Sequence, residues 1–265
     1  LADDGGSGID SVENDEAYLV RVTTRLAIDR QRRSAARRES YVGPWLPEPI
    51  VTEPGRPSTA TDPAEAAELA DSLSFAFLVV LDRLTPAERA AFILHDVFGV
   101  PFDEVARTLD RETEACRQLA SRARRKLRDE SGGLTAAATE TSLPADTFAG
   151  LLTALLSGDV EGFLRLLAPD VVLVSDAGAD RRAARHHVLG PDRVGRLLLN
   201  LFARGHEHVH GLRPVLVNGA TGLLIEHDEG PIVITGRATP DGRVDRVFIQ
   251  MNPTKLAGVA AHPEG

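Results

Sequence analysis

Side chains that could read the edges of DNA bases gather at the start of one basic segment. They are Glu114, Arg117, Gln118 and Ser121, and arginine suits guanine, glutamine suits adenine and glutamate suits cytosine. The cationic residues that follow suit phosphates, which position a protein without specifying a sequence; they are Arg122, Arg124, Arg125, Lys126 and Arg128. With Thr113 at its start, this segment is a candidate DNA-contact site.

A helix-turn-helix is the element that would position these side chains. Its first helix would span residues 102–109, Asp110 and Arg111 would form a tight turn, and the second helix would span residues 112–130. The apolar residues that can pack between the two helices are Val105, Ala106, Leu109, Cys116, Leu119 and Ala120. The small Ala106 lets the helices approach closely. A helical hairpin whose solvated arginine face contacts another protein is the alternative.

Two more predicted helices precede the motif, over about residues 64–83 and 89–98. The sequence Thr85-Pro86-Ala87-Glu88 indicates an N-cap, a proline at the first helical position and a capping box. Gly99 is a candidate left-handed C-cap for the same helix. Residues 63–130 therefore form one predicted all-α domain.

A basic helix and two linkers complete the N-terminal half. Residues 15–39 have an apolar stripe with arginines on the opposite face; the stripe is Tyr18, Leu19, Val22, Leu26 and Ile28. Residues 41–62 contain five prolines and read as an extended linker. Residues 131–143 are small and polar, which predicts a second linker.

Residues 144–265 have a different pattern, with helices first and short strands after them. Helices are predicted over 146–157, 160–167 and 192–203, and strands over 171–175, 206–210, 214–217, 221–227, 231–235 and 244–251. Turn sequences at Asp228-Glu229-Gly230 and Pro240-Asp241-Gly242 favour antiparallel hairpins. This order predicts an α+β domain.

Polar residues of the C-terminal half form no motif whose spacing dictates a reaction. The candidates are Asp176, His186, His187, Asp228 and Asp245. Asp176 precedes Ala177-Gly178 and reads better as part of a turn. On a strand, His206, His208 and His210 would share one face and could bind zinc, but an exposed sheet face gives the same alternation. We expect no catalytic residue, no metal and no cofactor.

Several segments together resemble the extracytoplasmic-function (ECF) sigma factors of bacterial RNA polymerase. Residues 84–99 followed by the helix-turn-helix resemble the domain that reads the promoter −35 element, and residues 18–33 resemble the last helix of the −10-reading domain. Residues 41–49 (YVGPWLPEP) and Asn252-Pro253-Thr254-Lys255-Leu256 resemble two signatures of one subgroup, which carries a C-terminal SnoaL-like domain. Thr254 stands where that subgroup has aspartate.

The resemblance implies roles for three sets of residues. The predicted DNA-contact site would read the −35 element. The −10 region would be contacted by Arg21, Thr24, Arg25, Asp29, Arg32 and Arg33. Interdomain regulatory contacts would involve Trp45, Leu46, Pro47, Glu48, Pro49, Asn252, Pro253, Lys255 and Leu256. The earlier helices of the −10 domain have no counterpart here, so we expect a truncated form.

The resemblance and the residue patterns together predict a multidomain protein. Residues 1–40 would be the remnant of the −10-reading domain, 41–62 a linker, 63–130 the −35-reading domain, 131–143 a second linker and 144–265 a SnoaL-like (nuclear-transport-factor-like) cone-shaped regulatory domain. The expected partners are promoter DNA and core RNA polymerase. For the C-terminal domain, a purely regulatory packing module is favoured over a module whose cavity binds a small ligand.

Amino-acid composition limits the function classes that fit this sequence. The net charge of −9 argues against diffuse nucleic-acid binding, but the basic residues are concentrated in two segments. One cysteine in 265 residues fits a reducing cytoplasm and excludes an internal disulfide, and nothing resembles a signal peptide or a membrane span. A ligand-responsive repressor and a SnoaL-type isomerase or hydrolase fused to a helical adaptor are the alternatives to a sigma factor.

Overall fold

The computed structural model describes residues 15–38, 43–54, 75–131, 143–179, 181 and 183–260. The chain forms two compact units, of which the first comprises residues 1–40 and 83–129 and the second residues 41–82 and 130–265. The predictions for residues 1–14, 55–74 and 132–142 lie outside the described residues.

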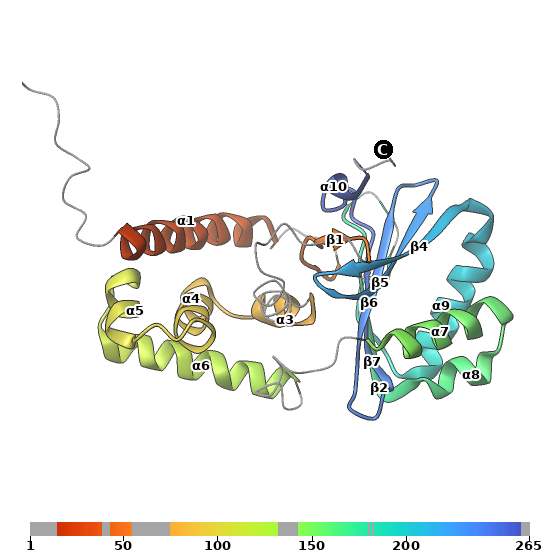
Figure 1. Cartoon of the computed structure of the whole chain (residues 1–265), viewed down its shortest axis with the longest axis horizontal. Helices are drawn as coiled ribbons and strands as arrows, with labels where there is room; N and C mark the ends of the chain where they lie inside the picture. Colours follow the sequence, from red (N-terminus) through yellow and green to blue (C-terminus); the bar gives the residue numbers. More distant parts are fainter. Residues whose placement is uncertain are drawn as a thin grey trace, which may run out of the picture. The chain divides into compact units, whose positions relative to one another are not determined.

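The first unit is helical. Its described elements are α1 (Asp15–Arg38), α4 (Pro86–Phe92), the π-helical turn η1 (Ile93–Val97), α5 (Phe102–Leu109) and α6 (Thr113–Ser131) (Figure 1). A core of small and medium side chains joins α4, η1, α5 and α6: Ala91, Leu94, Val105, Ala106, Cys116, Leu119 and Ala120 are all buried. The predicted packing of the helix-turn-helix is therefore confirmed.

Local signals set the ends of these helices. The Thr85 hydroxyl accepts a hydrogen bond from the Glu88 amide at 3.3 Å, and the Thr85 amide donates one to the Glu88 carboxylate at 3.0 Å, which confirms the capping box. Gly99 has φ +68°, as predicted for a C-cap. Asp110 has φ 54°, a left-handed conformation that aspartate tolerates, and it makes the tight turn before α6.

The basic helix α1 differs in part from its prediction. It lies against α4 and α5, but Tyr18, Leu19 and Leu26 of the predicted apolar stripe are more than half exposed. Val22, Ile28 and their neighbour Thr24 are half-buried instead. The predicted apolar stripe was therefore wrong for Tyr18, Leu19 and Leu26, because α4 and α5 cover a narrower part of the α1 surface than the stripe occupies.

The second unit is built on a seven-stranded sheet with the order β1-β4-β5-β6-β7-β2-β3. The strands are β1 (Val51–Thr52), β2 (Leu167–Asp176), β3 (Val188–Leu189), β4 (Val209–Val217), β5 (Ala220–His227), β6 (Ile232–Ala238) and β7 (Val244–Gln250). The two predicted hairpins are confirmed as β5–β6 and β6–β7. β2 and β7 are parallel neighbours. The chain between them contributes β3, β4, β5 and β6, and the linker contributes β1.

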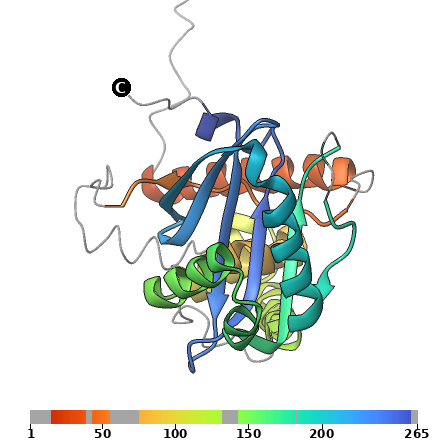
Figure 2. The same ribbon diagram turned by 90° about the vertical axis from the view of Figure 1, so that its right-hand side faces the viewer.

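Each face of this sheet carries its own core. On one face lie α7 (Ala145–Ser157), α8 (Val160–Arg165) and α9 (Pro191–Gly205), as Figure 2 shows. They cover Val171, Leu173, Val247 and Ile249 among others. The opposite face packs against α3 (Phe75–Leu81), the linker residue Leu46 and Leu256 beside α10 (Ala257–Ala260). The ring centroids of Phe75 and Phe248 are 5.5 Å apart.

One predicted strand needs correction. The predicted strand at 206–210 is wrong at its start, because His206–His208 form a 3₁₀ turn (η2) and β4 begins at Val209; the three histidines do not alternate along one strand. Of the predicted helix at 64–83, the described part is α3, which belongs to the second unit together with the proline-rich linker. In the described part of the chain, no helix is long and apolar enough to cross a membrane.

Candidate nucleic-acid interface and linker-docking site

The predicted base-reading residues share an exposed side of α6. Glu114, Arg117, Gln118 and Ser121 are exposed, whereas Cys116, Leu119 and Ala120 are buried against α4 and α5. Glu114 and Arg117 lie 3.3 Å apart, N to O. Thr113 is half-buried at the helix start. The first unit therefore presents polar side chains of the predicted types on the solvent side of its second helix-turn-helix element.

A ring stack that the sequence analysis missed supports Arg117. Phe102 lies 5.8 Å from the Arg117 guanidinium carbon, and His95 stacks on Phe102 with centroids 3.7 Å apart. His95 Nδ1 is 2.9 Å from the Val100 carbonyl oxygen. His95 lies in the π-helical turn η1 and packs against Phe102 of α5. Arg117 is thus held by a ring on one side and a carboxylate on the other.

Three cationic residues assigned to phosphates already have carboxylate partners inside the first unit. Arg124 Nε lies 2.6 Å from Asp96. Glu88 is 6% exposed and pairs with Lys126 at 2.8 Å and with Arg122 at 3.8 Å. Arg125 is exposed and of the cationic set has the clearest access to a phosphate. The side chain of Arg128 lies outside the described residues.

Glu88 links the capping box to Lys126 of α6. These contacts and the burial of Glu88 determine the pKa of its carboxyl. Burial alone would raise the pKa of its carboxyl, but hydrogen bonds from Lys126 and Thr85 outweigh burial and hold the pKa below the ordinary 4.5. Because the folded pKa is the lower one, the charged form stabilises the fold above pH 4.5. This stabilisation is lost as the pH falls from there through the folded pKa.

Glu88→Gln should lower the stability of the first unit by about 1–3 kcal/mol at neutral pH, because Lys126 loses a buried charged acceptor. Urea titration of the wild type and the variant from about pH 7 to pH 3 measures the difference, which should shrink as Glu88 becomes protonated in the wild type. Glu112→Gln is the matched control, since Glu112 is exposed beside α6. A difference that stays constant with pH would contradict the ion-pair explanation.

The predicted −10 contacts lie on α1. Arg21, Arg25, Asp29, Arg32 and Arg33 are exposed, and Thr24 is half-buried. Arg32 pairs with Asp29 at 3.5 Å, and Arg33 Nε donates to the Asp29 carbonyl oxygen at 3.2 Å. The arginines are therefore accessible as predicted, while Thr24 is more enclosed.

The linker residues predicted to be regulatory are docked on the second face of the sheet. Leu46 is fully buried, Pro47 and Pro49 are buried, and Glu48 is exposed. The Trp45 ring is half-buried, and the Lys255 ammonium nitrogen lies 4.1 Å from its centroid. The linker then continues into β1, which pairs with β4. The structure thus brings the Trp45–Pro49 segment and Lys255 together.

A buried carboxylate organises this contact. Asp176 is fully buried at the end of β2. Its Oδ2 accepts hydrogen bonds from the Leu46 amide at 2.8 Å and from Lys255 Nζ at 2.6 Å. Lys255 Nζ also donates to the Leu46 carbonyl oxygen at 2.6 Å. Both polar backbone groups of Leu46 are therefore satisfied, which a buried backbone requires.

Side-chain amides complete the docking site. Gln250 is fully buried and its Nε2 donates to the Pro47 carbonyl oxygen at 3.0 Å. Its Oε1 accepts from the Asn252 amide at 3.1 Å. Asn218 accepts from the Ile50 amide at 3.1 Å. Gln250 and Asn218 lie in no motif of the sequence and were not predicted as site residues.

The Asn252–Leu256 segment is divided between contacts and solvent. Asn252 and Leu256 are buried, and the Asn252 side chain accepts from the Thr254 amide at 3.0 Å. Pro253 and Thr254 are exposed. The substitution of threonine for aspartate therefore falls on a solvent-facing side chain, and the docking contacts of Lys255 do not depend on it.

Three polar candidates of the C-terminal half, Asp176, Asp228 and Asp245, each have partners of their own. Asp176 is a docking residue, although the Gly178 amide does donate to its Oδ1 at 3.1 Å as the predicted turn requires. Asp245 is paired with Arg237, and Asp228 accepts from His208 and His210. Those two hydrogen bonds hold the pKa of Asp228 below its ordinary value. Among the described residues, no group of three or more His, Cys, Asp or Glu could hold a metal ion.

Comparison with known proteins gives consistent matches. Residues 74–127 match the family model "Sigma-70, region 4". The chain is 37% identical to the ECF RNA polymerase sigma factor SigJ of Mycobacterium tuberculosis, over 93% of this chain and 80% of SigJ. It is 34% identical to a protein of the same species described as a probable ECF RNA polymerase sigma factor, SigI, over 97% of this chain and 83% of SigI. The crystal structure of SigJ superposes with a TM-score of 0.72 at 33% identity, covering 94% of this chain and 84% of that one.

Proposed function

Because the chain belongs to the ECF RNA polymerase sigma factors, we propose that α6 reads the promoter −35 element and that the docked linker restrains the factor in cis. The family membership makes promoter DNA and RNA polymerase its partners. A repressor or an adaptor-fused isomerase is not favoured by these relatives. The working place of the factor is then the bacterial cytoplasm, where RNA polymerase acts.

The observation that carries the −35 proposal is the exposed side of α6. Arg117 and Gln118 are exposed on it beside Glu114. An arginine at such a position can contact guanine bidentately and a glutamine can contact adenine. Arg125 supplies a phosphate contact, whereas Arg122, Arg124 and Lys126 exchange a carboxylate partner for a phosphate or keep α6 in place. On α1, exposed Arg21, Arg25, Arg32 and Arg33 contact the −10 region, with Asp29 and Thr24 beside them.

Run-off transcription tests this function. The full-length protein is added to core RNA polymerase on templates whose −35 element is intact or scrambled, and we expect the transcript to depend on the intact element. An Arg125→Ala variant should weaken binding to all sequences and reduce the salt dependence of binding. Active polymerase that gives equal transcript from both templates would contradict −35 reading by this chain.

The restraint in cis follows from how the linker is held. Residues 46–52 are fixed to the second unit by the contacts of Asp176, Gln250, Asn218 and Lys255 and by the β1–β4 pairing. A docked linker limits the distances that the basic helix and the helix-turn-helix can span, and both must reach their promoter elements together. Regulation then requires docked and released states of similar free energy.

Lys255→Met should release the linker and raise the run-off transcript yield by about twofold or more, as expected when a restrained population is shifted toward the competent state. Arg196→Met is the matched control, because Arg196 is an exposed cation on α9 in the same unit. A yield that is unchanged or reduced in Lys255→Met, with wild-type yield in the control, would contradict the restraint.

The C-terminal SnoaL-like domain acts in this proposal as a regulatory module with a ligand cavity and without catalysis. Asp176, the acidic residue at the end of β2, is used in linker docking. The cavity on the opposite face of the sheet is lined by apolar side chains. An acid or base catalyst has to lie within hydrogen-bond reach of the proton it transfers, and the cavity lining offers none among the described residues.

A further inference from the structure

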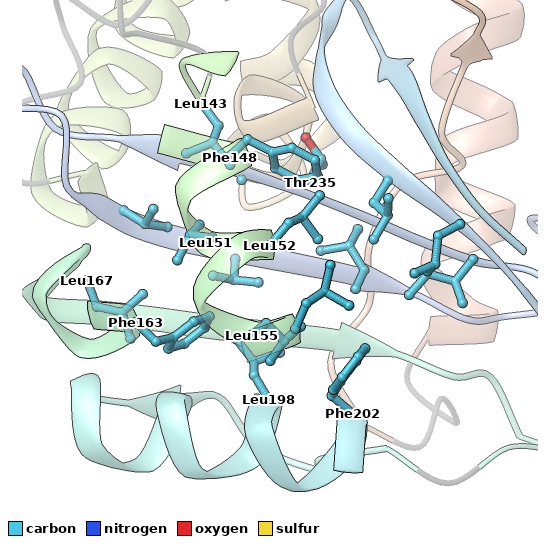
Figure 3. Close-up of a pocket in the computed structure, with 18 residues that line it drawn as sticks. Leu143, Phe148, Leu151, Leu152, Leu155, Phe163, Leu167, Leu198, Phe202 and Thr235 are labelled. Carbon is cyan, nitrogen blue, oxygen red and sulfur yellow. The ribbon is translucent and has the colours of Figure 1, made fainter. Parts of the chain in front are cut away.

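The cavity of the C-terminal domain has about 100 Å³ of space between the sheet and α7, α8 and α9. Figure 3 shows Phe148, Leu151, Leu152 and Leu155 of α7 directed toward it, with Leu198 and Phe202 of α9 on the other side. The lining residues without an apolar side chain are Thr235 and Gly236. The Thr235 hydroxyl donates a hydrogen bond to the Thr221 carbonyl oxygen at 3.0 Å. All lining surface open to the cavity is apolar.

The cavity opens to solvent at one end. Two of its lining residues are exposed leucines, Leu156 at 60% and Leu212 at 40%. A molecule can therefore enter between the end of α7 and β4 without unfolding the domain. The polar end of such a molecule would stay at this opening, in water.

The lining decides what can bind. Apolar cavities of about 150 Å³ stay dry and bind compounds the size of benzene, so the present space is sufficient for part of an alkyl chain. A buried hydroxyl or amide would find no hydrogen-bond partner there, and burial without a partner costs free energy. Resting on the proposal that the cavity takes a ligand, we infer that the ligand is an alkyl chain, free or carried by an amphiphile.

The same strands connect the cavity to the linker. Leu223, Ile234 and Val247 line the cavity, and their chain neighbours Leu224, Val233 and Phe248 belong to the core that holds the linker. Successive side chains of a strand point to opposite faces. An alkyl chain in the cavity packs against strands whose other face holds Leu46, so the ligand stabilises the docked linker.

Titration calorimetry with 1-octanol on the whole chain tests the inference. We expect saturable one-site binding, with binding of 1,8-octanediol weaker by about tenfold or more because its second hydroxyl would be buried without a partner. Hydrogen exchange at the amides of Leu46 and Ile50, which donate to Asp176 and Asn218, should slow severalfold with octanol. No saturable binding, equal binding of the diol, or unchanged exchange at both amides would overturn the inference.

Variants localise the binding. Leu152→Phe narrows the cavity and should weaken octanol binding by about tenfold or more, because the phenyl ring is larger than the isobutyl group it replaces and a close-packed site does not expand to make room for it. Leu189→Phe is the control, since Leu189 is 56% exposed on β3 and outside the lining. Leu156→Asp, at the exposed opening, should also weaken binding and adds no buried charge. Equal loss in Leu152→Phe and Leu189→Phe, or wild-type binding in both cavity variants, would contradict the location.

The binding experiments and the transcription experiment test separate claims, so a failure of the ligand inference can be distinguished from a failure of the proposed function. A factor that gives no promoter-dependent transcript but binds octanol and not the diol would contradict −35 reading and leave the ligand inference standing. A factor that gives promoter-dependent transcript but binds neither compound would contradict the ligand inference and leave −35 reading standing.

Discussion

Asp176→Asn should lower the free energy of unfolding of the second unit by about 3–5 kcal/mol, the usual consequence of removing one member of a buried ion pair. The carboxylate is fully buried and accepts hydrogen bonds from Leu46, Gly178 and Lys255. Asparagine has nearly the same shape but removes the carboxylate that the Lys255 ammonium contacts. The change therefore removes charge rather than volume.

Denaturant unfolding followed by the fluorescence of Trp45, the single tryptophan, measures this change. Trp45 belongs to the docked segment, so its signal reports the linker as well as the domain. Asp170→Asn is the matched control, because Asp170 is an exposed residue of the same strand, and it should change stability by less than about 0.5 kcal/mol. Equal effects of the two substitutions would mean that the buried pair does not hold the linker.

The charge of the pair can be separated from its packing. In the double variant Asp176→Asn with Lys255→Met, no ammonium remains to be satisfied, so the double variant should be more stable than the sum of the two single losses predicts. A buried ion pair replaced as a whole is often nearly neutral. Strict additivity would indicate that the two residues act independently.

The helix-turn-helix could be predicted from sequence because its signals are local. Thr85, Pro86 and Glu88 mark one helix start, Gly99 and Asp110 mark two helix ends, and small residues mark the packed sides of α5 and α6. Each of these features acts over four residues or fewer. The partners of the cationic residues could not be predicted this way, because Arg124 meets Asp96, 28 positions earlier.

The linker-docking site could not be predicted from local sequence patterns. Family resemblance indicated the segments involved, and the structure gave their contacts. The contacts of Leu46 with Asp176 and Lys255 join residues 130 and 209 positions apart, and no local pattern specifies such a pairing. Resemblance pointed to both segments that meet, but Asp176 was assigned to a turn and Gln250 was overlooked. The predicted strand at residues 206–210 was wrong for the opposite reason. The alternation of its histidines is a local pattern, but the chain forms a 3₁₀ turn there, at the end of α9.

Arg117→Ala should weaken binding of the chain to a −35 element by about 1–3 kcal/mol, or roughly 5- to 150-fold, which is the contribution of a good base-edge contact. The loss should be confined to the intact element. Arg117 is exposed on α6, with Phe102 at 5.8 Å and Glu114 at 3.3 Å supporting its side chain. An arginine already held in place loses less conformational freedom on binding than a free one.

Fluorescence anisotropy with labelled duplexes, at one fixed salt concentration, measures the effect on an intact element and on elements changed one base pair at a time. For Arg117→Ala, the duplex changed at the contacted base pair should bind about as well as the intact one, whereas the wild type distinguishes them. Arg196→Ala, on α9, controls for the loss of one positive charge, and Phe102→Leu tests the support, with an expected loss smaller than that of Arg117→Ala. Unchanged affinity of Arg117→Ala for the intact element would remove Arg117 from the base-reading set and leave Gln118 and Glu114 as the remaining candidates, because these two side chains share its exposed side of α6.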